Sequence, residues 1–124
     1  MLTLFAIGTG GFVGAISRYL LAKQTHHWFG YHFPYGTLTV NALGSLLIGV
    51  LSGYFLEHTD LNNELRAGLI VGVLGAFTTF STFSYETLLL IQEGDFWKMG
   101  LNVLSNVLIC LILCFFGFQI AKYF

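Results

Sequence analysis

The amino-acid sequence predicts an all-α membrane protein in which four helices cross the bilayer. Hydrophobic residues make up 56% of the chain and charged residues only 9%, whereas a soluble domain carries about 25% charged residues. The apolar residues gather in four long stretches, and the charges fall mainly between them. Because lipid offers the peptide backbone no hydrogen-bond partners, each of these stretches is expected to cross the membrane as a helix.

The four predicted spans are residues 2–22, 35–56, 66–91 and 98–122, which form a single domain over residues 1–124. Each is near the roughly 20 residues that a helix needs to cross a hydrocarbon core of about 30 Å. The connecting segments are short, which makes neighbouring helices antiparallel, and they are expected to hold most charges and histidines, including Lys23, His26 and His27. The net charge of −1 argues against a nucleic-acid partner, which would require a basic surface.

The distribution of positive charges does not determine which way the chain is oriented in the membrane. With the N-terminus inside, Arg66 and Lys122 would lie inside, and Arg18, Lys23 and Lys98 would lie outside. Two against three is too small a bias for the positive-inside rule. Either the loops simply carry few charges, or the chain inserts both ways and pairs with an inverted copy of itself. Four helices of this length barely enclose a site, so we expect a transport path between two subunits.

Small residues at four-residue spacing mark one face of each of the first two spans. Gly10 and Gly14 lie in the first span, and the row in the second span comprises Asn41, Ser45, Gly49 and Gly53. Such rows let helix backbones approach closely in lipid, where packing replaces the hydrophobic drive. We therefore interpret these faces as helix-packing surfaces.

Asn41 lies inside the second span, where an unpaired amide is costly. It either forms an interhelical hydrogen bond that only holds the bundle together or belongs to a polar path. The fourth span favours a path, since it carries a stripe with four-residue spacing: Asn102, Asn106, Cys110 and Cys114. Amides and hydroxyls are neutral donors, suited to a partly dehydrated anion that must not be held tightly. The cysteines are interpreted as small packing residues.

The third span contains the most unusual segment of the chain. Between Thr78 and Ser84, five of seven residues bear hydroxyls, and the other two are Phe80 and Phe83. Gly75 and the threonine pair are expected to break the helix at mid-membrane, which would free carbonyl oxygens that suit a hard cation. The positive edges of the two rings would suit an anion path without a fixed charge. The alternative is that the rings only pack and the hydroxyls bond to carbonyls one turn earlier.

Three segments resemble one known family. They are the run Gly75-Ala-Phe-Thr-Thr-Phe-Ser-Thr-Phe-Ser84, the run Gly36-Thr-Leu-Thr-Val-Asn41, and the end of the first span at Arg18. Together they closely resemble the Fluc (CrcB) family of fluoride channels, and the similarity extends over the whole chain. It implies a passive fluoride-selective channel, not an enzyme, that exports fluoride across a bacterial inner membrane and so confers fluoride resistance. It also implies an antiparallel, dual-topology homodimer with two pores at the subunit interface and a central structural sodium ion.

The resemblance also implies roles for individual residues. The backbone carbonyls of Gly75 and Thr78 would bind the sodium ion. Phe80 and Phe83 would line the fluoride pores, in which Asn41 would donate an amide hydrogen bond. A polar track along the ion path would comprise Asn102, Asn106, Ser84, Glu86 and Thr37.

Arg18 would lie near a vestibule and attract anions. Two features depart from the pattern of the family. Family members often carry a hydroxyl, sometimes that of a tyrosine, where this chain has Asn102 and Asn106. Ala76 stands where the family often has a second glycine, which would stiffen the expected break slightly.

Two other classes of membrane protein remain as alternatives. A small multidrug antiporter also has four helices, but it needs a carboxylate deep in its first span, and residues 2–22 contain none. A membrane anchor or assembly subunit without a transport role would explain the glycine rows. It would leave the hydroxyl-rich segment of the third span without a purpose.

Overall fold

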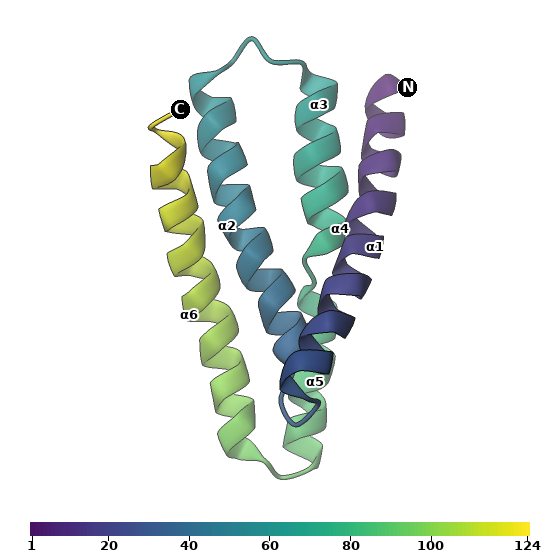
Figure 1. The fold of residues 1–124 in the computed structure, drawn as a ribbon, viewed down its shortest axis with the longest axis vertical. Coiled ribbons are helices and arrows are strands. Elements are labelled where there is room, and N and C mark those ends of the chain that lie inside the picture. Colours follow the sequence, from purple (N-terminus) through teal and green to yellow (C-terminus); the bar gives the residue numbers. More distant parts are fainter.

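Four long apolar helices run up and down the molecule in the computed structural model, which describes residues 1–124 (Figure 1). The first two are α1 (Leu2–Phe29) and α2 (Tyr35–Glu57), and the last is α6 (Phe96–Ala121). The third span is divided into α3 (Asn63–Ala67), the π-helical segment η1 (Gly68–Leu74), α4 (Gly75–Phe77) and α5 (Phe80–Gln92). The prediction of four membrane-spanning helices with a broken third one is confirmed.

Helix α1 is longer than the sequence predicts. It continues to Phe29 instead of ending near residue 22, so Lys23, His26 and His27 lie on its last turns and not in a loop. That placement of the three side chains was wrong, because the predicted boundary followed charge and not helix propensity. The helix ends where Gly30 adopts a φ of 85° and donates its N–H to the His26 carbonyl, a conformation that glycine adopts at little cost. The other bounds differ from the predicted ones by at most three residues.

The glycine rows pack against neighbouring backbones. Gly14 of α1 faces η1 so closely that an added Cβ would overlap the Val73 carbonyl oxygen. Gly49 of α2 faces α6 in the same way, at the carbonyl of Cys114, and Gly117 of α6 faces the carbonyl of Leu46. Close backbone approach at small residues is the expected way for helices to associate in lipid.

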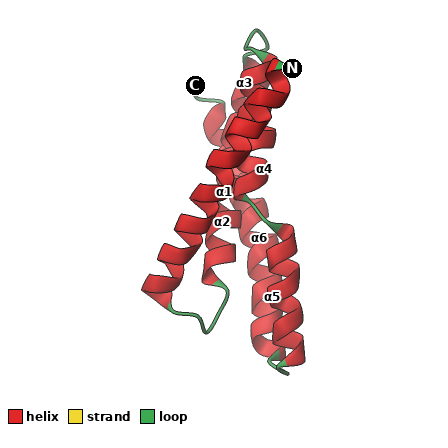
Figure 2. Ribbon diagram, turned by 90° about the vertical axis from the view of Figure 1, so that its right-hand side faces the viewer, coloured by secondary structure: helices red, strands yellow, loops and turns green.

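The two halves of the third span pack against different partners. The upper half, α3 to α4, lies along α1, whereas α5 packs against α6 and α2. Figure 2 shows the chain changing direction between α4 and α5, and α1 diverging from α5 and α6 below that point. The break therefore lies where the bundle opens.

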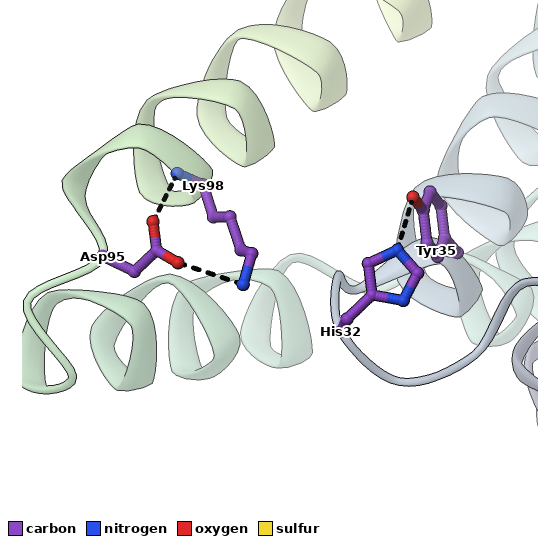
Figure 3. A network of polar contacts seen from close by, with 4 residues as sticks. All are labelled: His32, Tyr35, Asp95 and Lys98. Carbon is purple, nitrogen blue, oxygen red and sulfur yellow. Dashed lines mark hydrogen bonds and ion pairs between the residues drawn. The ribbon is translucent and has the colours of Figure 1, made fainter.

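Three polar contacts lie at the helix starts, at the end of the molecule opposite the termini (Figure 3). Asp95 caps α6: its Oδ1 accepts the Lys98 N–H at 3.1 Å, and its Oδ2 pairs with Lys98 Nζ at 3.0 Å. The backbone hydrogen bond, followed by the side-chain contact, lowers the pKa of Asp95, so the cap is charged at neutral pH. Across the gap, His32 Nε2 lies 3.2 Å from the Tyr35 hydroxyl at the start of α2.

Candidate functional site

The third span unwinds at Thr78 and Thr79. Both residues are extended, with φ/ψ of −84°/159° and −152°/114°. Gly75 keeps helical dihedrals of −61°/−35°, so the threonines and not the glycine carry the break. The Thr79 hydroxyl caps α5 by accepting the Thr82 N–H at 3.2 Å, as N-cap threonines do. The helix thus ends and restarts within two residues.

Asn41 of α2 replaces the hydrogen bonds that the break removes. Its Oδ1 accepts the Thr79 N–H at 2.8 Å, and its Nδ2 donates to the Thr79 carbonyl at 3.0 Å. The same Nδ2 also donates to Oδ1 of Asn106 at 3.0 Å. Asn41 therefore connects α2, the break and α6 through a single amide. Gly44, one turn further along α2, leaves the room that the Thr78 side chain occupies.

The amide chain, which we define as Asn41, Asn106, Asn102 and Thr87, continues from this point. Asn106 Nδ2 donates to both the backbone and side-chain oxygens of Asn102, each at 3.0 Å. Asn102 Nδ2 donates to Thr87 Oγ1 at 3.0 Å, and Thr87 donates to the Phe83 carbonyl at 2.7 Å. Asn102 is fully buried. Sequence reasoning missed Thr87, although its position four residues after Phe83 is a spacing at which a helical threonine bonds back to a carbonyl.

Phe80 and Phe83 occupy the first turn of α5 with their rings in contact. The ring centroids lie 5.4 Å apart and the planes are tilted by 50°. Their exposure differs: Phe83 is 9% exposed and Phe80 is 78% exposed. Together with Asn41, Thr79 and Asn106 they line a groove of about 370 Å³ between α2, the third span and α6. The groove places the two rings beside the amides of Asn41 and Asn106.

A second cavity, of about 480 Å³, lies between α1, α2 and α5. Three basic side chains of α1 line it, namely Arg18, Lys23 and His26, and so do hydroxyl groups, including that of Thr79. Arg18 reaches the break itself, since its Nη1 lies 3.4 Å from the Thr78 carbonyl. A concentration of positive charge in a cavity with low-dielectric walls attracts anions. Thr79 lines both cavities.

The remaining polar-track residues lie outside the amide chain. Thr37 donates to Glu86 Oε1 at 2.8 Å, and Glu86 Oε2 is buried without a partner. Ser84 donates to the Phe80 carbonyl at 2.9 Å on an exposed face, which is the bond to a carbonyl one turn earlier that the sequence offered as an alternative. The five predicted track residues therefore form separate groups in this chain and not one continuous line.

The two carbonyl oxygens expected to bind a cation, those of Gly75 and Thr78, accept few hydrogen bonds within the chain. The Thr79 N–H goes to Asn41 and not to the Gly75 carbonyl, and no side chain donates to that carbonyl. The Thr78 carbonyl accepts only the long contact from Arg18. Backbone carbonyls are hard oxygen ligands, so the donor type fits an alkali cation. Two oxygens do not fill a coordination shell, however, so a second copy of the chain would have to complete it.

The matching family model and the similar named proteins agree with each other. Residues 5–118 match the model of the family described as CrcB-like protein, Camphor Resistance (CrcB). The chain is 47% identical over 123 residues to a protein of Geobacter metallireducens named fluoride-specific ion channel FluC, covering 99% of both chains. Proteins of the same name from Campylobacter jejuni and Shewanella sp. are 46% and 49% identical over 120 and 121 residues. These two alignments cover 97% of this chain and 98% and 96% of the relatives.

Proposed function

This chain belongs to the CrcB family, and from this premise we propose that it is a passive, fluoride-selective ion channel. Its relatives are channels and not enzymes. The observation that carries the proposal is the broken third span, where the Asn41 amide and the rings of Phe80 and Phe83 line one groove. A conducted anion needs neutral groups that replace its water without holding it tightly. Amide N–H groups and the positive edges of aromatic rings meet that need.

Asn41 would donate a hydrogen bond to fluoride in exchange for one of the two that its amide makes within the chain. Both of its amide hydrogens are engaged, one with the Thr79 carbonyl and one with Asn106. The bond to Thr79 is one half of a paired contact, because Thr79 also donates its N–H to the same amide. The bond to Asn106 is the single one, so it is the bond that fluoride would replace. Exchange of one hydrogen bond for another keeps the anion loosely bound, as conduction requires.

The cavity lined by Arg18, Lys23 and His26 would serve as the vestibule. The charges of Arg18 and Lys23 raise the local concentration of anions beside the break. Arg18 lies closest to the break, at the Thr78 carbonyl. The protein would lower cytoplasmic fluoride by letting the anion leave down its gradient, across the inner membrane of a bacterium.

A second, inverted copy of the chain would complete the pores. Within the third span, Gly75, Ser81 and Ser84 are exposed, as is the ring of Phe80. Lipid does not satisfy exposed polar backbone, so a protein partner is expected to cover this face. The near balance of positive charges on the two sides supports an antiparallel, dual-topology homodimer with two pores. Sodium held at the centre by the Gly75 and Thr78 carbonyls of both copies would supply positive charge between the two anion paths.

Purified protein in liposomes tests the function directly. Vesicles loaded with fluoride and chloride are diluted into a medium without either ion, and both effluxes are followed with ion-selective electrodes. We expect rapid fluoride efflux that needs no proton gradient, and chloride efflux no faster than from protein-free vesicles. Equal efflux of both halides would contradict the selectivity, and fluoride movement only under an imposed pH gradient would favour the antiporter.

Cysteine labelling tests the dual topology. Cys110 and Cys114 lie within α6, so a background in which both are replaced carries one new cysteine, at Asp60 or at Glu93. These positions lie in the α2–α3 connection and just after α5, at opposite ends of the bundle (Figure 1). A membrane-impermeant maleimide added to intact cells should label half of the copies at each position. Full labelling at one position and none at the other would establish a single orientation.

A further inference from the structure

Two amides of the amide chain, those of Asn41 and Asn106, have their orientation set by backbone groups. A side-chain amide can turn by 180°, which exchanges donor and acceptor. Asn41 cannot turn, because Thr79 offers it both an N–H and a carbonyl. Asn106 is fixed in the same sense, since its Nδ2 faces the backbone carbonyl of Asn102. The chain therefore runs in one direction, with each Nδ2 donating to the next residue.

The far end of the amide chain is set by Thr87. Its hydroxyl hydrogen points to the Phe83 carbonyl at 2.7 Å, which leaves the lone pairs of Oγ1 to accept from Asn102 Nδ2 at 3.0 Å. Thr87 is half-buried and lines neither the groove nor the vestibule cavity. Its contacts are thus with the Asn102 amide and with the carbonyl of a pore phenylalanine.

Without the Thr87 hydroxyl the amide chain would lose its fixed end. Asn102 is fully buried, and a buried amide hydrogen without an acceptor is costly. The Asn102 amide would relieve this cost by rotating, which would withdraw the Oδ1 that accepts from Asn106. Asn106 would then keep only its bond to the Asn102 backbone carbonyl, so the Asn106 Oδ1 that accepts from Asn41 would be held less firmly.

We propose that Thr87 is a positioning residue for the fluoride path. It orients Asn102, and through Asn102 it steadies the Asn106 oxygen that accepts the exchangeable hydrogen bond of Asn41. Hydrogen bonds in such a chain polarise one another, so the loss of one end is felt along its length. The inference rests on the proposed channel function, but it concerns a residue for which neither the sequence pattern nor the family resemblance implied a role.

The test compares three variants by fluoride efflux per folded protein, with the folded fraction taken from size-exclusion chromatography. Thr87→Val removes the hydroxyl at nearly constant volume and should lower efflux about fivefold, which corresponds to about 1 kcal/mol for one net hydrogen bond. Thr87→Ser keeps the hydroxyl and should restore efflux to near the wild-type rate. Thr25→Val is the matched control: Thr25 is buried in α1 and bonds only to the Leu21 carbonyl, so its loss should leave efflux unchanged.

A second step asks whether Thr87 acts through Asn102. In an Asn102→Ala background, Thr87→Val should cause no further loss of efflux, because the group that Thr87 orients is gone. Wild-type efflux in Thr87→Val would overturn the inference, as would equal losses in the valine and serine variants. Should the valine variant fail to fold, Thr87→Ala replaces it in the same comparison with serine. Absence of fluoride efflux from the wild-type protein would instead overturn the proposed function.

Discussion

Fluoride efflux is expected to disappear when Phe83 is replaced by isoleucine. The ring of Phe83 lies in the groove beside Asn41, Thr79 and Asn106, where the positive edge of an aromatic ring can attract an anion without carrying a net charge. Isoleucine fills much of the same space but offers no ring edge, so the dehydrated anion would lose a partner that aliphatic methyl groups cannot replace. We expect efflux in liposomes to fall to the rate of protein-free vesicles.

The fold of the Phe83→Ile variant should persist. Phe83 is 9% exposed, and replacing a buried ring by a smaller aliphatic group leaves a cavity that costs stability. Phe77→Ile serves as the matched control, because Phe77 is buried in the same span at 6% exposure but does not line the groove. Both variants should elute from a sizing column as the wild-type protein does, and only the Phe83 variant should lose efflux. Wild-type efflux in the Phe83 variant would remove the ring from the mechanism.

The sequence was sufficient to predict the four spans and the break in the third. Both follow from local composition: uncharged stretches of membrane length, and a threonine pair beside a glycine. The exact position of the break did not follow, because Gly75 keeps helical dihedrals and the two threonines become extended. Asn41 explains the difference. Its amide takes over the backbone groups of Thr79, so a residue 38 positions away stabilises unwinding at the threonines.

The polar contacts of the site illustrate what sequence reasoning could not supply. Asn41, Asn102 and Asn106 were selected correctly as polar groups inside apolar spans, and the structure brings all three together. Their common end at Thr87 was not predicted, since a helical threonine in isolation has a local partner and signals nothing more. Arg18 was expected near a vestibule, but its contact with the Thr78 carbonyl depends on how closely α1 approaches the third span. That approach is a tertiary property, set by the glycines between the two helices.

Replacing Gly14 by alanine should therefore prevent most of the protein from reaching its folded state. An added Cβ would overlap the Val73 carbonyl oxygen and lie 2.9 Å from the Val73 carbonyl carbon. Both atoms belong to the backbone, so no side chain can rotate to make room, and α1 must move away from η1. Overpacking of this kind costs about 1–3 kcal/mol or more. We expect a large loss of monodisperse protein after detergent extraction, with a lower thermal midpoint in the fraction that remains.

Gly11→Ala is the control that separates this effect from helix propensity. Gly11 lies in the same helix, and an added Cβ there would meet nothing within 4 Å. Alanine is favoured over glycine inside a helix by about 1 kcal/mol, so this variant should be as stable as the wild type or more so. Equal stability of the two variants would show that α1 tolerates displacement from η1. If Gly14→Ala is the less stable variant, its remaining folded fraction should also conduct fluoride slowly, because Arg18, one turn beyond Gly14, moves with α1 away from the break.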